Sequence, residues 1–352
     1  MIAPSRRIGI LATALCATGC TEPVTDETPA AVTVMAFNVQ NLFDNLDDPD
    51  KDDKAYLPFD AKQNDAHIAE CNTIAVESWR NECLYLDWDD AALDHKLATV
   101  AEAIRQVADG RGPDIVALQE VENLAILERL RTEYLDDSGY LPGLLIEGTD
   151  TRGVDVAFLT RLPTSGPPVL HPFDLPDEFA DRAGDTRGLI EATFELPDGS
   201  KLTGYSVHFP APFHPTEMRV LAFEHLQRVR AELPAGHNVF AAGDFNTTST
   251  EDASEDMLDR FVRNDWLVSN DYCNGCPGTH HYARDDAWSF LDMVIFAPSA
   301  SPENAWQISN VELAIEVPAQ VTIDSTPNRY HSAERTGVSD HWPVVMTLEK
   351  RP

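Results

Sequence analysis

The segment NVFAAGDFN (residues 238–246) is a short apolar run that ends abruptly in polar residues. Its first part has the length and composition of a buried β-strand, and Asp244 and Asn246 come where the strand runs out. The end of a strand is where a rigid scaffold presents side chains to a binding or catalytic site. The segment therefore predicts a core strand with a functional site at its end.

Six further polar residues stand at the ends or beginnings of other apolar runs: Asn38, Glu120, His208, Asp292, Asp340 and His341. Each of them, taken singly, is typical of a turn former or a hydrogen-bonded edge residue. Together they are the residue types that hydrolysis at a hard cation requires, because Mg²⁺ binds oxygen ligands and a carboxylate–histidine pair transfers protons. The set therefore predicts a metal-dependent hydrolytic site.

Apolar runs and amphipathic segments alternate along the chain from residue 31 onward. The spacing of apolar residues predicts helices over 91–109 and about 216–233, with a further helix after the run 115–118. Strands are expected at 32–37, 115–118, 154–159, 188–194, 202–207, 238–242, 293–296 and 343–348. Residues 44–90 and 163–187 are expected as long insertions or loops. This mixture, without an internal repeat, predicts one layered α/β domain with mixed sheets.

The composition excludes several classes of protein. A hydrophobic share of 43% in 352 residues is enough for a full core and excludes a disordered chain. The chain has 59 Asp and Glu against 26 Lys and Arg, a formal net charge of −33. This charge argues against a broad basic surface for nucleic acid and against electrostatic docking on anionic lipid.

Residues 1–19 predict an export signal, because a positively charged start precedes a short apolar run and small residues. The ending Ala-Thr-Gly before Cys20 is typical of a bacterial lipoprotein signal, in which Cys20 is lipidated; plain secretion is the alternative. Residues 20–30 predict a tether to a domain over 31–352. We therefore expect a secreted protein or a cell-envelope lipoprotein, at the outer membrane or periplasmic face. Membrane contact is expected only through a lipid at Cys20.

Four cysteines follow the predicted signal and tether: Cys71, Cys83, Cys273 and Cys276. An even number in an exported chain favours disulfides, and we expect the two local pairs, Cys71–Cys83 and Cys273–Cys276. A zinc site is the alternative, since Cys273 and Cys276 have the spacing of half a zinc ribbon. The second half is missing, because Cys71 and Cys83 are too far apart in sequence.

Seven segments carry a resemblance to a known family: FNVQNLFD (37–44), LQEVEN (118–123), RGVDVAFL (152–159), SVHFP (206–210), GDFN (243–246), FLDMVIF (290–296) and SDHWPV (339–344). In this order they resemble the endonuclease/exonuclease/phosphatase superfamily, and its exported bacterial nuclease-like branch. The resemblance covers about 32–349 and implies a deoxyribonuclease-I-like fold. That fold is a four-layered α/β sandwich, in which two mixed β-sheets pack face to face with helices outside.

The resemblance also implies roles for individual residues. Glu120 resembles the principal metal ligand, with Asn38 beside it and Asp340 completing the metal or phosphate environment; the metal is Mg²⁺ or Mn²⁺. Asp244 and Asn246 resemble the pair that positions the attacking water and the phosphate.

Three further side chains complete the implied machinery. Asp292 resembles the partner that orients His341, and His208 resembles a hydrogen-bond donor to the phosphate or a general acid. Arg152 is a candidate contact to a phosphate oxygen, and Arg187 a weaker one. The resemblance leaves open whether His341 or Asp244 is the general base.

The function that these features predict is an exported phosphodiesterase that depends on a divalent metal. Its substrate is expected to be DNA or RNA, hydrolysed by in-line attack of water, and the protein is expected to be a monomer. The first alternative is the same chemistry on a lipid or a phosphate monoester, as in a sphingomyelinase-like phospholipase or a phosphatase. The second is a surface lipoprotein that binds a ligand without catalysis.

A lipid substrate would require exposed aromatic or apolar loops. Trp79 and Trp88 near Cys83 are the nearest candidates, and we expect them to pack in the core or on a disulfide. The segment after His208 reads FPAPFHP, a departure from the family pattern in which His214 and the prolines reshape the substrate wall.

Residues 44–60 form an acidic segment with seven Asp and two Lys. Asp48, Asp50 and Asp52 alternate as at the start of a calcium-binding loop. The sixth position is Asp53 in place of Gly and the twelfth is Phe59 in place of Glu, so this is not an EF-hand. A solvated acidic loop and a structural Ca²⁺ site both remain open.

Overall fold

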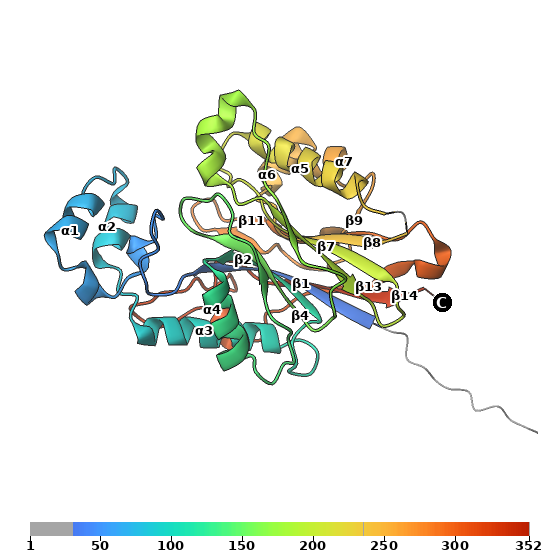
Figure 1. The fold of residues 1–352 in the computed structure, drawn as a ribbon, viewed down its shortest axis with the longest axis horizontal. Coiled ribbons are helices and arrows are strands. Elements are labelled where there is room, and N and C mark those ends of the chain that lie inside the picture. The colour runs from blue at the N-terminus through green and yellow to red at the C-terminus, as the bar shows by residue number, and fades with distance from the viewer. Residues whose placement is uncertain (1–30, 235, 352) are drawn as a thin grey trace, which may run out of the picture.

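The computed structural model describes residues 31–234 and 236–351. The predicted export signal (1–19), the tether (20–30) and the lipidation site at Cys20 lie outside the described residues. Within the described part, the domain expected from residue 31 onward is built around two β-sheets (Figure 1).

Each of the two sheets has six strands and contains both parallel and antiparallel pairs. The first has the order β13 (Trp306–Leu313), β14 (Val344–Lys350), β1 (Ala31–Leu42), β2 (Ile115–Val121), β4 (Asp155–Thr160) and β3 (Leu144–Leu145). The second has the order β5 (Val169–His171), β6 (Leu189–Glu195), β7 (Lys201–His208), β8 (Asn238–Asp244), β12 (Asp292–Ala297) and β9 (Leu267–Val268). A separate hairpin joins β10 (His280–Tyr282) and β11 (Ala287–Ser289).

Helices cover the outer face of each sheet, which makes four layers. Figure 1 shows α3 (Asp90–Arg105) and α4 (Leu124–Arg129) on one side of the paired sheets. On the other side lie α5 (Thr216–Ala231), α6 (Ser249–Glu255) and α7 (Met257–Phe261). The predicted four-layered α/β sandwich is confirmed. No helix among the described residues has the length and hydrophobicity needed to cross a membrane.

The core consists of three apolar layers, one between the sheets and one under each group of helices. Successive side chains of β1 belong to two different apolar layers. Val34 and Ala36 pack between the sheets, while Met35 and Phe37 pack in the layer that includes residues of α3. Because successive side chains point to opposite faces, a strand buried on both faces reads as a continuous apolar run. This is why the core strands were predictable from sequence.

Both β1 and β2 lose their regular register near their carboxyl ends. β1 continues to Leu42, beyond its predicted end, with a register shift after Asn38. Gln40 and Asn41 adopt positive φ angles there, and Glu120 in β2 has a φ of 64°. Bulges of this kind re-aim side chains at the edge of a sheet. The two irregular strand ends therefore place polar side chains of β1 and β2 at one edge of the fold.

Residues 44–90, expected as a long insertion or loop, are not a simple loop. The segment contains α1 (Asp65–Cys71) and α2 (Glu77–Tyr85), which project from the body of the protein (Figure 1). Both helices have mostly exposed residues and weak amphipathic patterns, so no helical signal stands out in the sequence. Trp79 is 58% exposed and does not belong to the core, whereas Trp88 is buried as expected.

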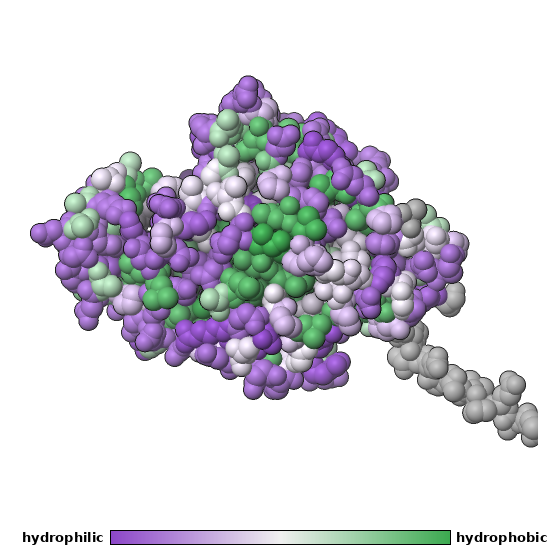
Figure 2. Space-filling model, in the orientation of Figure 1, coloured by the Kyte–Doolittle hydropathy of each residue, from purple (hydrophilic) through white to green (hydrophobic). Residues whose placement is uncertain are grey.

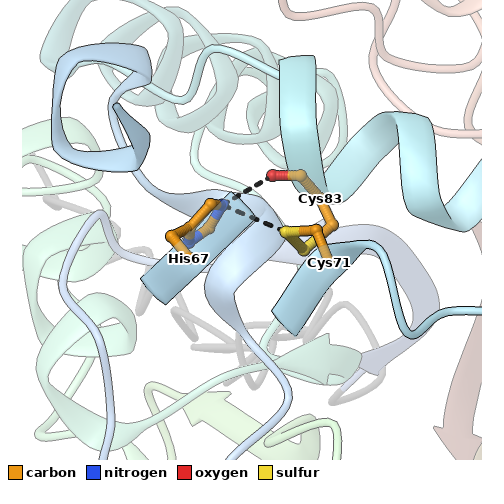
Figure 3. Close-up of side chains that lie close together, drawn as sticks. All are labelled: His67, Cys71 and Cys83. Carbon is orange, nitrogen blue, oxygen red and sulfur yellow. Dashed lines mark hydrogen bonds between the residues drawn. A yellow bond between two sulfur atoms is a disulfide. The ribbon is translucent and has the colours of Figure 1, made fainter. Parts of the chain in front are cut away.

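Disulfides join the cysteines in the two local pairs that were expected, Cys71–Cys83 and Cys273–Cys276. The first fastens α1 to α2, and Nε2 of His67 lies 3.2 Å from Sγ of Cys71 beside it (Figure 3). A sulfur in a disulfide is not a thiolate, so these four cysteines do not provide the zinc site that was the alternative.

Residues 163–187, likewise expected as a long insertion or loop, contain β5 and a 3-10 helix (Asp177–Asp185). β5 is an edge strand of three residues, too short to give an alternating pattern. β13 was not predicted either, because it is an edge strand in which only Trp306 and Val311 are buried. The face of the protein seen in Figure 2 is mostly polar, and its largest apolar area lies near the centre of the view.

Candidate functional site

Strand ends of both sheets meet around a cavity of about 150 Å³. Eight polar side chains of the cavity wall come from the predicted set: Asn38, Glu120, Arg152, Arg187, His208, Asp244, Asn246 and His341. The parallel pairs β1–β2 and β7–β8 explain this convergence, because the carboxyl ends of parallel strands lie at the same edge of a sheet. The scattered polar residues of the sequence therefore form one site.

Asp244 lies at the centre of this site. Its Oδ2 accepts a hydrogen bond from the side-chain amide of Asn38 at 3.1 Å and lies 3.6 Å from Nε2 of His208. Its Oδ1 accepts one from the backbone N–H of Asn246 at 2.8 Å. Burial, followed by the nearby charge of Asp292, raises the pKa of Asp244 to about 7. The carboxylate is thus fixed in position and poised near neutrality.

His341 is paired with Asp292 behind the cavity wall. The Nδ1–H of His341 donates to Oδ2 of Asp292 at 2.7 Å, and Asp292 is fully buried. Burial alone would lower the pKa of His341, but Asp292 outweighs it and the pKa is raised well above its usual range. The bond uses Nδ1, so Nε2 is the nitrogen that remains for a substrate.

The backbone around His341 is also held in place. The hydroxyl of Ser339 donates to the carbonyl oxygen of Asn38 at 2.7 Å and accepts the backbone N–H of His341 at 3.0 Å. One serine thereby connects the end of β1 with the segment that enters β14. Sequence reasoning did not identify Ser339, since its role depends on two segments that only the fold brings together.

His208 has the opposite electrostatic environment. It lines the cavity on β7, directly opposite Asp244 in the strand register. Burial, together with the positive charges of Arg187 and Arg152, lowers its pKa well below the usual range. His341 therefore favours the charged form and His208 the neutral form. Two titratable groups whose pKa values are shifted in opposite directions are typical of acid–base catalysis.

Asn38 and Glu120 provide oxygen ligands suited to a divalent metal. Oε2 of Glu120 accepts the backbone N–H of Asn41 at 2.9 Å, which orients the carboxylate at the bulge. Oδ1 of Asn38 accepts the N–H of Gln40 at 3.0 Å and keeps a second lone pair. Asp244, Asp292 and His341 each place one ligand atom within 4.8 Å of the others. The oxygen donors that line the cavity, those of Asn38, Glu120 and Asp244, fit a divalent cation.

Asp340 is the one predicted metal ligand that the structure does not place in the cavity wall. Its carboxylate lies 3.6 Å from Arg329, and its backbone carbonyl lies 2.9 Å from Nδ1 of His280. Burial would raise its pKa, but His341 and Arg329 outweigh this and the pKa is lowered. The expected role of Asp340 as a ligand therefore finds no geometric support in the cavity.

Several residues of the cavity wall had not been predicted as site residues. Asp150 forms a buried ion pair with Arg187, and its Oδ1 accepts the backbone N–H of Arg152 at 2.7 Å. The Arg152 guanidinium donates to Oδ1 of Asn41 at 2.6 Å. Asp150 thus holds the Arg187 guanidinium and the backbone of Arg152 at the cavity, although it stands in a loop without any periodic signal.

The opposite side of the cavity is formed by the segment after His208. Phe213 is 76% exposed at its rim, and the ring of His214 lies tilted against it with ring centroids 4.2 Å apart. Both residues line the cavity, so this segment forms part of its wall. Arg219 lies in α5 and pairs with Glu251, a structural ion pair away from the cavity.

The family comparison covers most of the chain. A model of the Endonuclease/Exonuclease/phosphatase family matches residues 87–341. A search of curated protein sequences gave no significant match.

Solved structures share the fold at low sequence identity. An endonuclease/exonuclease/phosphatase from Beutenbergia cavernae is 18% identical, with a TM-score of 0.54 over 91% of this chain and 72% of that chain. A family protein from Bacteroides thetaiotaomicron is 16% identical, with a TM-score of 0.56 over 92% and 100%. A mannosyl-6-phosphatase from the same organism is 18% identical, with a TM-score of 0.54 over 90% and 99%.

Proposed function

The chain belongs to the Endonuclease/Exonuclease/phosphatase family, and from this premise we propose that it is an exported phosphodiesterase that uses a divalent metal to cleave nucleic acid. Members of this family are hydrolases of phosphoester bonds and generally use divalent metals. The observation that carries the proposal is the convergence of Glu120, Asp244 and the Asp292–His341 pair on one cavity.

The metal ligands in this proposal are Glu120 and Asn38, and the metal is Mg²⁺ or Mn²⁺. When bound, such a cation stabilises negative charge on a phosphoryl oxygen. The cavity itself offers two guanidinium groups, those of Arg152 and Arg187, for the remaining phosphate oxygens. Arginine suits this task because its planar group binds phosphate with two parallel hydrogen bonds.

The remaining residues move protons and fix the water. Asn246 and Asp244 position the attacking water in line with the phosphorus–oxygen bond that breaks. The Asp244 carboxylate is placed to accept its proton, and Nε2 of His341 is the alternative acceptor when the imidazole is neutral. His208, which is neutral in its buried position, donates a hydrogen bond to the phosphate or assists the leaving oxygen.

A phosphatase acting on monoesters is the second candidate, and the size of the cavity favours it. A volume of about 150 Å³ with two arginines accommodates one phosphate group and little more. The solved mannosyl-6-phosphatase shares the fold of this chain. A polymer substrate would instead extend over the rim, where Phe213 offers an exposed ring on which a base can stack.

A panel of substrates tests the two candidates. Metal-free protein is assayed with Mg²⁺ or Mn²⁺ on plasmid DNA, RNA, bis-p-nitrophenyl phosphate, p-nitrophenyl phosphate, mannose 6-phosphate and sphingomyelin. Hydrolysis of the diesters and nucleic acids supports the proposal, and hydrolysis of the monoesters alone supports the phosphatase. A protein inactive on every substrate would favour the non-catalytic lipoprotein.

The variant Glu120→Gln locates the activity in this cavity. It is expected to lose at least about 100-fold in kcat/KM, because the principal metal ligand is removed. Glu334→Gln, at an exposed position, is the matched control and is expected to retain full activity. Nicking that survives Glu120→Gln would place the chemistry elsewhere.

We also propose that the protein works outside the cytoplasm as a monomer, anchored by lipid at Cys20. The two disulfides are compatible with an extracellular protein. The net charge of −33 suits a soluble exported surface and predicts weak binding of nucleic acid that improves with divalent cations. Labelling with a fatty acid tests the anchor: incorporation is expected in the wild type and absent in Cys20→Ser.

A further inference from the structure

A second group of carboxylates lies at the ends of β1 and β2, apart from the residues that line the cavity. Asp48, Asp53 and Glu122 each place one carboxylate oxygen within 4.8 Å of the other two. Asp53 is 1% exposed and Glu122 is 2% exposed, and Asp48 is half-buried. Two of them come from the acidic segment after β1, and the third follows β2 directly. The fold therefore brings together acids from two segments far apart in sequence.

Part of this group has no hydrogen-bonding partner. Oδ2 of Asp53 accepts the backbone N–H of Asp48 at 2.7 Å, and Oε2 of Glu122 accepts that of Asp44 at 2.6 Å. The other oxygens, Oδ1 of Asp53 and Oε1 of Glu122, are buried without a partner. Burying a carboxylate oxygen in this way is strongly unfavourable unless a positive charge or a donor compensates it.

The basic residues of the acidic segment do not supply that charge. Lys51 donates to the backbone carbonyl of Asp150 at 2.9 Å, and Lys54 pairs with Glu70 at 2.6 Å. Among the described residues, no lysine or arginine forms an ion pair with Asp48, Asp53 or Glu122. A positive charge is therefore missing where three acids meet.

We propose that Asp48, Asp53 and Glu122 bind a structural Ca²⁺ ion. All donors at the site are oxygens, which Ca²⁺ prefers, and Ca²⁺ accepts the irregular geometry of ligands from two separate segments. Zinc would instead be favoured by histidine or cysteine ligands, which this cluster lacks. Because Glu122 lies far from residues 44–60 in sequence, the acidic segment alone did not match a calcium-loop pattern. The inference is independent of the proposed function.

The position of the ion explains what it would stabilise. The acidic segment touches the loop of Arg152, since the backbone N–H of Asp52 donates to the carbonyl of Thr151 at 2.8 Å. The same segment continues from the bulge of β1, and Glu122 follows the bulge at Glu120. A cation bound here would fasten three segments that frame the cavity, and its removal would loosen them together.

Thermal melting of the whole protein tests the site. Protein stripped of metal with a chelator is melted with 1 mM Ca²⁺, with 1 mM Mg²⁺ and with neither. A rise of at least about 4 °C with Ca²⁺, and a clearly smaller one with Mg²⁺, is expected. Equilibrium dialysis should give one bound Ca²⁺ for each chain. An unchanged melting temperature would overturn the proposal, and an equal effect of Mg²⁺ would overturn the assignment to Ca²⁺.

Variants decide where the ion binds. Asp53→Asn with Glu122→Gln keeps the shape of both side chains and should abolish the rise and the bound ion. Asp60→Asn, at an exposed position in the same acidic segment, should change neither. Glu120→Gln, which removes the proposed cavity ligand, should also retain both. An ion lost in Glu120→Gln but kept in the double variant would place it in the cavity and overturn the proposal.

Folding of the double variant is not essential to this test. If it does not fold, Asp48→Asn alters a single half-buried ligand, and a weakening of Ca²⁺ affinity of at least about tenfold is expected. An Asp48→Asn protein that binds Ca²⁺ as tightly as the wild type would overturn the proposed ligand set.

Discussion

Nδ1 of His341 lies 2.7 Å from Oδ2 of Asp292, although 49 residues separate the two in sequence. Asp292 is the first residue of β12 in the second sheet, whereas His341 stands just before β14 in the first sheet. The bond therefore connects the two sheets at the cavity. It orients the imidazole through a carboxylate that is fully buried and cannot reach a substrate itself.

Removing the Asp292 charge should impair catalysis without removing the histidine. Asp292→Asn keeps the size of the side chain, lowers the pKa of His341 and loosens its orientation. A loss in kcat of about 10²- to 10⁴-fold is expected, with KM changed much less. Steady-state kinetics on bis-p-nitrophenyl phosphate measures both quantities.

The chain offers a matched control for this substitution. His281 and Asp286 form a similar pair, with 3.0 Å between Nε2 and Oδ1, but the Asp286 side chain is 95% exposed. Asp286→Asn should leave kcat unchanged. Equal losses in the two variants would mean that the Asp292–His341 bond has no special part in the reaction.

Gly243 should tolerate no side chain. A Cβ at this position would lie 2.0 Å from the carbonyl oxygen of Val207 and 2.9 Å from Nε2 of Gln119, and its φ is 147°. Gly243→Ala is therefore expected to lower the free energy of unfolding by at least about 3 kcal/mol. Gly199 has a φ of 81° with open space around it, so Gly199→Ala should lower it by only about 1 kcal/mol. Urea denaturation that gives equal losses would refute the steric argument.

The site could be predicted where it depends on local sequence, and not where it depends on the fold. Asp244 and His208 follow apolar runs that are buried on both faces, so their place at strand ends was visible. The pairing of Asp292 with His341 came from the family resemblance, because no spacing rule connects residues in different sheets. The positive φ of Glu120 was also hidden, since it arises from a bulge that only the partner strands define.

The ion pair of the cavity wall could not be predicted for the same reason. Asp150 and Arg187 stand in loops, and their ion pair forms only when two distant segments meet. The short helices α1 and α2 were missed for a different reason, because their mostly exposed residues give little periodic signal. Sequence thus predicts the layers and the strand-end residues, while long-range polar pairs require the structure.

The two disulfides should differ in their contribution to stability. Cys71–Cys83 closes a loop with a sequence separation of 12, whereas Cys273–Cys276 spans only 3. A longer loop restricts the unfolded chain more, so the double variant Cys71→Ser/Cys83→Ser should lose about 3 kcal/mol and Cys273→Ser/Cys276→Ser about 2 kcal/mol. Urea denaturation under oxidising conditions measures both. A larger loss for the second pair would contradict the loop-length argument.

A buried histidine outside the site should make the protein sensitive to acid. Nδ1 of His225 in α5 accepts a hydrogen bond from the Arg228 guanidinium at 3.0 Å, and the ring packs against Phe173. Burial, and then the charge of Arg228, lowers the pKa of His225 below its ordinary value of 6.5. The unfolded chain therefore takes up a proton at a higher pH than the folded one.

The sign of the pH effect follows from this difference. The stability contributed by neutral His225 is present above pH 6.5 and is lost as the pH falls toward the folded-state pKa, by at most about 1.4 kcal/mol for each pH unit. His225→Gln cannot take up a proton, so its free energy of unfolding should fall less between pH 7.5 and 5.5 than that of the wild type. His331→Gln, at an exposed position, should follow the wild type. Urea denaturation at both pH values decides the matter: if His225→Gln loses as much stability as the wild type, another group carries the acid sensitivity.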